Sequence, residues 1–282
     1  MKFFSKIFFI LIKIIDYIFK IFKKKSFKFH LYNNMSNSFY SKLKIKEKDI
    51  SFYTPSLISK RRIETLFSKE PDTIRWIENF DDKEQIFWDI GANIGIYSIY
   101  AASFSENIKV ISFEPSFANL KILSRNISTN GLSDKIKIIQ FPLTDKPNQI
   151  LNFNEFSLEE GASQNSFGVE YGHDGKVMNF KNSVNIYGTN IDYLINNKIL
   201  EIPNYIKLDV DGIEHLILKG GESTVLKSNN VKSIILEINE DFKYQKNAVS
   251  EILKNNNFIY QEKNKIGVKS NCYNYIFKKK NL

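Results

Sequence analysis

The sequence of 282 residues has a single cysteine, Cys272, and lacks a long uninterrupted apolar run. One cysteine excludes an intrachain disulfide framework and a thiolate zinc cluster, and it is typical of a reducing compartment, so we expect a cytoplasmic protein. The mean hydropathy of −0.29 excludes a membrane protein with many spans. With 43% apolar residues the chain can bury a substantial core, and its length fits one large domain with attachments.

Arginine is also scarce, and the basic residues gather at one end of the chain. Residues 1–62 contain 15 Lys and Arg against 3 Asp and Glu, a net charge of +12, whereas the remaining 25 against 28 give −3. A domain that binds nucleic acid would be expected to carry its basic stripe on the working face. The distribution therefore predicts no nucleic-acid partner.

Residues 2–25 are mostly Phe, Ile, Leu and Tyr, and their charged residues fall on one narrow stripe of a helix. Lys6, Lys13, Asp16 and Lys20 disfavour a membrane span, since a central charge costs about 2.5–3.5 kcal/mol. A secretory signal is disfavoured because no small-residue cleavage site follows. We expect residues 1–25 to form an amphipathic helix. It either lies peripherally on an anionic inner membrane or packs on the protein body or on a second copy in a homo-oligomer.

Residues 26–84 are predicted to form a connector with a short strand at 49–53, followed by a helical region interrupted at Pro71. From residue 85 onward short apolar strands alternate with helices, which predicts a parallel sheet covered on both faces. The expected strands are 85–90, 109–114, 135–141, 205–210 and 233–238, and the expected helices are 94–103, 119–130, 191–196, 213–226 and 248–255. Two late strands, 258–262 and 272–278, have no helix between them and predict an antiparallel edge.

The fold class is therefore α/β, with a Rossmann-like, doubly wound and mostly parallel sheet, an antiparallel C-terminal edge strand and an N-terminal helical extension. A polar interval at 146–190 is predicted to be an insertion in the domain 85–282. It is rich in hydroxyl and amide groups that suit sugar hydroxyls, so it is either a functional lid or an exposed hairpin without a ligand.

The segment DIGANIG at 89–95 stands where a strand breaks into a helix. Its glycines allow a sharp turn and the close approach of a cofactor to backbone N–H groups, although a purely structural turn is the alternative. A dinucleotide fingerprint would place glycine at position 93, where this chain has Asn93. Glu114 follows the next strand, where it either binds both hydroxyls of a ribose or forms a cap or surface salt bridge. The two features together indicate a cofactor that contains adenosine.

Five segments in this order resemble the FkbM family of S-adenosylmethionine-dependent methyltransferases, between about residues 87 and 260. They are FWDIGANIGIYSIYAA, VISFEPSFANLKILSRNISTNG, EEGASQNSFG, YIKLDVDGIEHLILKGG and SIILEIN. The chain departs from the family pattern at Asp211, where glutamate is usual, and at His215. The resemblance implies a class I methyltransferase fold for residues 85–282 and S-adenosylmethionine as cofactor. The residues expected to bind it are Asp89, Gly91, Asn93, Gly95, Ser98 and Glu114.

Carboxylates also follow two later strands. Asp209 and Asp211, at i and i+2, are expected to point to one face, and Glu237 ends the neighbouring strand. These three could bind Mg²⁺ or Mn²⁺, which would lower the pKa of an acceptor hydroxyl. Alternatively, Asp209 or Glu237 acts as the base, or the carboxylates only cap a helix and pair with Lys207. Lys207, on an apolar strand, is expected to have a nearby carboxylate.

Histidines are the other conceivable bases, although a single histidine in a helix or an exposed loop is more often a bystander. His215 and His173 are the two considered, and the candidate catalytic residues are Asp209, Lys207, Glu237 and His215. The predicted function is O-methylation of a sugar hydroxyl on a bacterial surface glycan or its nucleotide-activated precursor. The alternatives are a nicotinamide-dependent oxidoreductase, which Asn93 disfavours, and a non-catalytic scaffold tethered to the membrane.

Overall fold

The computed structural model describes residues 1–23, 26–267 and 270–280. Its central sheet has seven strands, in the order β11 (Phe258–Lys265), β12 (Cys272–Lys279), β10 (Ser233–Asn239), β9 (Tyr205–Leu208), β3 (Gln85–Ile90), β4 (Ile108–Phe113) and β5 (Ile136–Ile139). The pairs from β10 to β5 are parallel, and β12 is antiparallel to both of its neighbours. The predicted fold class is confirmed. The C-terminal strand β12 lies between β10 and β11, so β11 forms the edge of the sheet.

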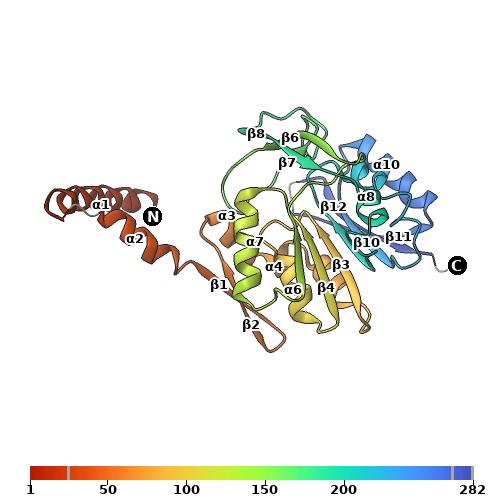
Figure 1. The fold of residues 1–282 in the computed structure, drawn as a ribbon, viewed down its shortest axis with the longest axis horizontal. Helices are drawn as coiled ribbons and strands as arrows, with labels where there is room; N and C mark the ends of the chain where they lie inside the picture. The colour runs from red at the N-terminus through yellow and green to blue at the C-terminus, as the bar shows by residue number, and fades with distance from the viewer. Residues whose placement is uncertain (24–25, 268–269, 281–282) are drawn as a thin grey trace.

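Helices cover both faces of this sheet (Figure 1). On one face lie α6 (Ile96–Phe104) and α7 (Phe117–Thr129), and on the other lie α8 (Ile191–Asn196), α9 (Glu214–Lys219) and α10 (Lys243–Asn255). Phe87 and Trp88 are successive residues of β3, both fully buried, and they belong to the cores on opposite faces. A strand buried on both faces has a nearly continuous apolar sequence, which explains why β3 was predictable.

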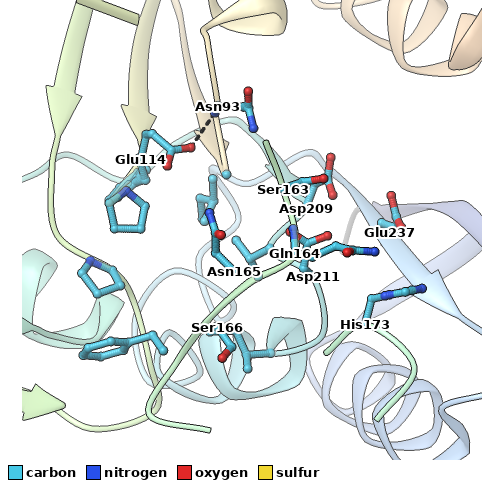
Figure 2. A pocket seen from close by; sticks show the side chains of 18 of the residues that line it. Asn93, Glu114, Ser163, Gln164, Asn165, Ser166, His173, Asp209, Asp211 and Glu237 are labelled. Atoms are coloured by element: carbon cyan, nitrogen blue, oxygen red, sulfur yellow. Dashed lines mark hydrogen bonds between the residues drawn. The ribbon is translucent and has the colours of Figure 1, made fainter. Parts of the chain in front are cut away.

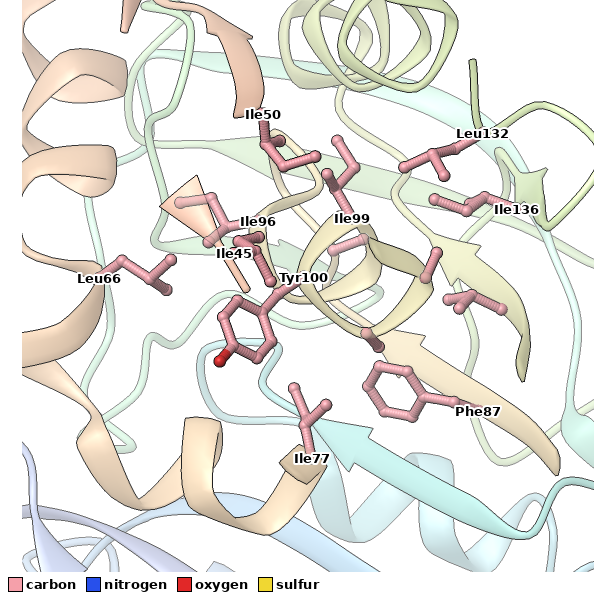
Figure 3. Packing of buried hydrophobic residues seen from close by; sticks show 14 of the residues in the cluster. Ile45, Ile50, Leu66, Ile77, Phe87, Ile96, Ile99, Tyr100, Leu132 and Ile136 are labelled. Atoms are coloured by element: carbon pink, nitrogen blue, oxygen red, sulfur yellow. The ribbon is translucent and has the colours of Figure 1, made fainter. Parts of the chain in front are cut away.

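Residues 40–78 pack on the body of the protein, and they include the predicted strand near 49–53 and the predicted helical region. They form the hairpin β1 (Tyr40–Ile45) and β2 (Lys48–Tyr53), followed by α3 (Leu57–Glu64), α4 (Leu66–Lys69) and α5 (Pro71–Glu78). Ile45, Ile50 and Leu66 are buried in the same core as Ile99 of α6 (Figure 3). The polar residues that suggested a connector occupy the exposed positions of the hairpin.

The N-terminal helix is present as α1 (Lys2–Lys23), and a second helix, α2 (Phe27–Ser36), follows it without having been predicted. Both lie to one side of the sheet and its covering helices (Figure 1). Asp16 of α1 accepts hydrogen bonds from the Ser26 hydroxyl at 2.7 Å and from the Lys28 N–H at 2.8 Å. Within the described residues, no helix combines the length and apolar character needed to cross a membrane.

The insertion forms a small antiparallel sheet of its own, in the order β7 (Asn165–Phe167), β6 (Gln149–Glu155) and β8 (Asn182–Gly188). Phe153 and Phe167 anchor it in the hydrophobic core that contains Trp88. The insertion is therefore packed on the domain, and the segment that joins β6 to β7 reaches the site described next.

Candidate functional site

A cavity of about 290 Å³ opens where β3, β4, β9 and β10 end (Figure 2). Gly91 and Glu114 line it from the ends of β3 and β4, and Asp209 and Glu237 line it from β9 and β10. Glu114 lies on one side of the cavity, and Glu237 and His173 lie on the other (Figure 2). Ligands of open α/β sheets bind in this position, outside the carboxyl ends of the strands.

The turn after β3 is shaped by close packing. A Cβ atom on Gly91 would lie 1.9 Å from the carbonyl oxygen of Asp209, so glycine is required where β3 meets β9. Asn93 adopts φ 52°, a left-handed conformation that asparagine tolerates better than most residues. Its N–H donates to Glu114 at 2.7 Å and its amide donates to the Ala162 carbonyl at 2.8 Å. Asn93 thus joins the turn to both the ribose-binding candidate and the insertion.

Glu114 is a buried carboxylate at the cavity wall, with 4% of its surface exposed. Its second oxygen accepts the Ser116 N–H at 2.8 Å, and burial raises its pKa to about 7. Each carboxylate oxygen can accept a further hydrogen bond, so the group fits the two hydroxyls of a ribose. The wall beside it includes Phe113, Pro142 and Leu143, an apolar surface that fits an adenine ring.

Three of the predicted cofactor residues do not line the cavity. Asp89 is completely buried, and it accepts a hydrogen bond from the Ser98 hydroxyl at 2.6 Å. Gly95 begins α6 in a left-handed conformation, and a Cβ atom there would lie 2.5 Å from Leu123. These residues therefore support the turn from behind, while Gly91, Asn93 and Glu114 reach the cavity.

Lys207 is the buried cation behind the site. It is 3% exposed, it stands opposite Asp89 in the register of β3 and β9, and its ammonium lies 2.9 Å from Asp209. The expected carboxylate partner is confirmed. Burial alone would lower the pKa of Lys207, but the charges of Asp209 and Asp89 raise it. Lys207 is not part of the cavity wall, and it contacts the wall through its pair with Asp209.

Asp209 and Glu237 have opposite electrostatic environments. Burial would raise the pKa of Asp209, but the ammonium groups of Lys207 and Lys69 lower it below the ordinary value. Burial, followed by the charge of Asp209, raises the pKa of Glu237 well above the ordinary value. Two carboxyl groups with divergent pKa values beside one cavity are a common arrangement for acid and base roles. Asp209 therefore favours its ionised form, whereas Glu237 retains a proton more readily than an ordinary glutamate does.

The turn after β9 is held by Glu214, whose role the sequence analysis missed. Its buried carboxylate accepts the N–H of Val210 at 2.9 Å and the N–H of Gly212 at 3.1 Å. This contact fixes Asp211 at φ 62°, and the Asp211 carboxylate accepts the Gln164 N–H at 2.6 Å. The motif that contains Glu214 was visible in the sequence, but nothing in its spacing identified an acceptor for backbone groups.

The predicted metal site is not assembled. Among residues 1–23, 26–267 and 270–280, no group of three or more His, Cys, Asp and Glu side chains is placed to hold a metal ion. The expectation assumed that the strand continues through Asp211, but β9 ends at Leu208 and the backbone reverses. Asp209 is directed to Lys207, and Asp211 is directed to the insertion, so Glu237 does not form a cluster with both.

His215 was also a predicted catalytic residue, but it does not line the cavity. It lies on α9 beside the rings of Phe242 and Tyr244, at centroid distances of 6.1 and 5.4 Å. His173, on the insertion, does line the cavity. Glu214 points to the turn, and His215 is the next residue of the same helix. Successive helical residues point in different directions, so His215 does not face the cavity.

The insertion forms part of the cavity wall, through Ser163, Gln164, Asn165 and Ser166. The Arg62 side chain donates to the Gly161 carbonyl at 2.6 Å, and Asn165 keeps a buried side-chain oxygen without a partner among the described residues. Arg62 and Lys69 also line the cavity, and sequence analysis missed both because they come from α3 and α4, far earlier in the chain.

The raised pKa of Glu114 predicts a pH dependence of cofactor binding. The ionised carboxylate accepts hydroxyl hydrogens better than the protonated acid does, and this form becomes dominant as the pH rises through about 7. We expect the affinity for S-adenosylmethionine to be about tenfold weaker near pH 6 than near pH 8. Calorimetric titration across this range measures it. Glu114→Gln should remove the pH dependence, and a dependence that survives in this variant would contradict the assignment.

Comparison with known proteins identifies a family for this chain. Residues 89–260 match the methyltransferase FkbM domain. The methyltransferase sdnD of Sordaria araneosa is 35% identical over 69 residues, which are 21% of this chain and 27% of that protein. This chain therefore matches only about a quarter of the length of that relative.

Similar solved structures have low sequence identity. A precorrin-6y C5,15-methyltransferase from Geobacter metallireducens has a TM-score of 0.45 and 14% identity, over 75% of this chain and 87% of that one. A putative SAM-dependent methyltransferase from Streptococcus mutans has a TM-score of 0.49 and 10% identity, over 85% and 55%. The domain match covers more than half of the sequence, in the region that builds the cavity. The chain belongs to the FkbM methyltransferase family.

Proposed function

We propose that this protein transfers a methyl group from S-adenosylmethionine to a hydroxyl of a sugar, on a bacterial surface glycan or its nucleotide-activated precursor. One observation carries the proposal. A single cavity connects Glu114, which is suited to a ribose, with the carboxyl groups of Asp209 and Glu237, beneath a segment rich in hydroxyl and amide groups. A donor and an acceptor could thus be held side by side.

The cofactor end of the cavity consists of Glu114, the backbone near Gly91 and Asn93, and the neighbouring apolar wall. When bound, S-adenosylmethionine supplies a methyl group that is already activated by a sulfonium. The ionised carboxylate of Asp209 favours a positively charged ligand, and Lys207 keeps that carboxylate in one orientation. The remaining task of the protein is to align the acceptor and to exclude water.

The acceptor end is defined by Glu237. Because its environment raises its pKa, Glu237 in its ionised form is a stronger base than an ordinary carboxylate, and it can take the proton of an acceptor hydroxyl as the new carbon–oxygen bond forms. Asp209, with its lowered pKa, remains ionised throughout. This division of roles assigns proton transfer to Glu237 and does not require a metal ion.

The segment above the acceptor end favours a sugar. Ser163 offers a hydroxyl, Gln164 and Asn165 offer amides, and the Asn165 side-chain oxygen has no hydrogen-bond partner among the described residues. The Ser166 hydroxyl already donates to the Val169 carbonyl at 2.8 Å. Hydroxyl and amide groups both donate and accept hydrogen bonds, as sugar hydroxyls do.

The test is to incubate the protein with S-adenosylmethionine labelled in the methyl group and a panel of nucleotide-sugars and surface glycans, with and without a chelator. We expect label on a sugar, stable to alkali as an ether is, and unaffected by the chelator. Glu237→Gln should lower the rate about 10²–10⁴-fold. Alkali-labile label would indicate a carboxylate acceptor, and loss of activity on chelation would restore the metal hypothesis. Reduction of NAD would favour the oxidoreductase, and no turnover on any substrate would favour the scaffold.

A further inference from the structure

The helix α1 presents a broad apolar surface to solvent. Phe4, Leu11, Ile18 and Phe22 lie within a narrow sector at 100° per residue, and they are 63%, 48%, 47% and 80% exposed. Asp16 is the buried residue of this helix among those described. A surface of this size on a water-soluble body indicates a site for an apolar partner.

The second helix does not cover this surface. Its contacts with α1 are made by Asp16, which binds Ser26 and Lys28, and by Phe19, whose ring stacks on Phe27 at 5.5 Å. At 100° per residue, Asp16 lies on the side of α1 away from Leu11, and Phe19 lies on the flank between Asp16 and Leu11. The second helix therefore contacts the polar side and one flank of α1, and Leu11 and its neighbours remain exposed.

Basic side chains lie on the side of α1 opposite the open sector. Lys6, Lys13 and Lys20 fall within one narrow stripe, and the single acid of α1, Asp16, lies 3.2 Å from Lys20. Residues 1–62 as a whole carry a net charge of +12. A second copy of this chain would bring an equal positive charge against the first, which opposes self-association, whereas an anionic surface would attract both.

We infer that the α1–α2 hairpin binds in the plane of an anionic lipid bilayer, with the sector around Leu11 in the acyl region and the lysine stripe at the headgroups. An apolar face combined with a lysine-rich polar face on the opposite side is the signature of a helix that lies on a membrane. The lysine charge adds electrostatic attraction to acidic lipids. The inference is independent of the proposed methyl acceptor.

The test is sedimentation of the full chain with vesicles that contain equal parts of phosphatidylglycerol and phosphatidylcholine, compared with vesicles of phosphatidylcholine alone. We expect binding to the acidic vesicles, weakened by high salt. Leu11→Glu should reduce the bound fraction about tenfold or more, because it places a charge in the apolar sector. Ser5→Glu is the matched control, since it adds the same charge to the polar stripe of the same helix and should retain most of the binding.

Three outcomes would overturn the inference. The first is failure of the full chain to bind acidic vesicles, and the second is an equal loss in Leu11→Glu and Ser5→Glu. The third is a dimer, detected by light scattering without lipid, that Leu11→Glu dissociates, since this would assign the apolar sector to a second copy. Circular dichroism of each variant establishes that the helix content is retained. Deletion of residues 1–25 should abolish vesicle binding and preserve the affinity for S-adenosylmethionine.

Discussion

Lys207→Met is expected to lower the free energy of unfolding by about 3–5 kcal/mol, because it leaves buried carboxylates without their counter-ion. Lys207 is 3% exposed, it pairs with Asp209 at 2.9 Å, and it stands opposite Asp89 in the sheet. For a domain of this size the loss corresponds to a decrease in Tm of about 10 °C. Thermal and urea unfolding, followed by circular dichroism, measure it.

Lys60→Met is the matched control, since it removes the same charge from an exposed pair. Lys60 lies 3.6 Å from Glu64, and both side chains are more than half exposed. Such a pair contributes about 0.2–1 kcal/mol at most. Adding Asp209→Asn to Lys207→Met should recover part of the lost stability, because the variant then has one fewer unpaired charge. Equal, small effects of Lys207→Met and Lys60→Met would show that the buried pair has no structural role.

Glu114→Ala is expected to weaken the binding of S-adenosylmethionine about 100-fold, which corresponds to two hydrogen bonds to a charged group. The Glu114 carboxylate faces the cavity, and it also holds the N–H groups of Asn93 and Ser116. The variant therefore loses both the ribose contact and part of the shape of the turn. Calorimetric titration gives the affinity, and a Tm measurement separates this loss from unfolding.

Glu84→Ala is the control for Glu114→Ala. Glu84 immediately precedes β3, at the opposite edge of the sheet from the cavity, and its exposed carboxylate pairs with Lys109. Its replacement should leave the affinity for S-adenosylmethionine unchanged. If Glu114→Ala bound the cofactor as tightly as Glu84→Ala does, the assignment of the ribose site would be wrong.

The sheet was predictable from sequence because its strands are encoded locally. The residues of β3 are buried on both faces, and those of α8 fall in one short apolar segment, so both elements were located within a residue or two. The turn at Gly91 and the acid at Glu114 were also identified, because each directly follows an apolar strand. Asp89, Gly95 and Ser98 were also predicted to bind the cofactor, but they do not line the cavity. Asp89, for example, is completely buried within β3.

Long-range contacts and local backbone reversals could not be predicted in the same way. Arg62 meets Gly161 across 99 residues, and neither position has a periodic pattern that indicates the other. The metal hypothesis treated Asp209 and Asp211 as alternate residues of one strand, but the chain turns at Asp211 with φ 62°. The role of Glu214 depends on that turn, so it became visible only in three dimensions.

The central claim is that the cavity at the carboxyl ends of β3, β4, β9 and β10 binds S-adenosylmethionine. Parallel calorimetric titrations of the full chain with S-adenosylmethionine and with NAD test this most directly. The structure predicts saturable binding of S-adenosylmethionine at one site per chain, lost in Glu114→Ala, and no binding of NAD. Binding of NAD without binding of S-adenosylmethionine would contradict the account.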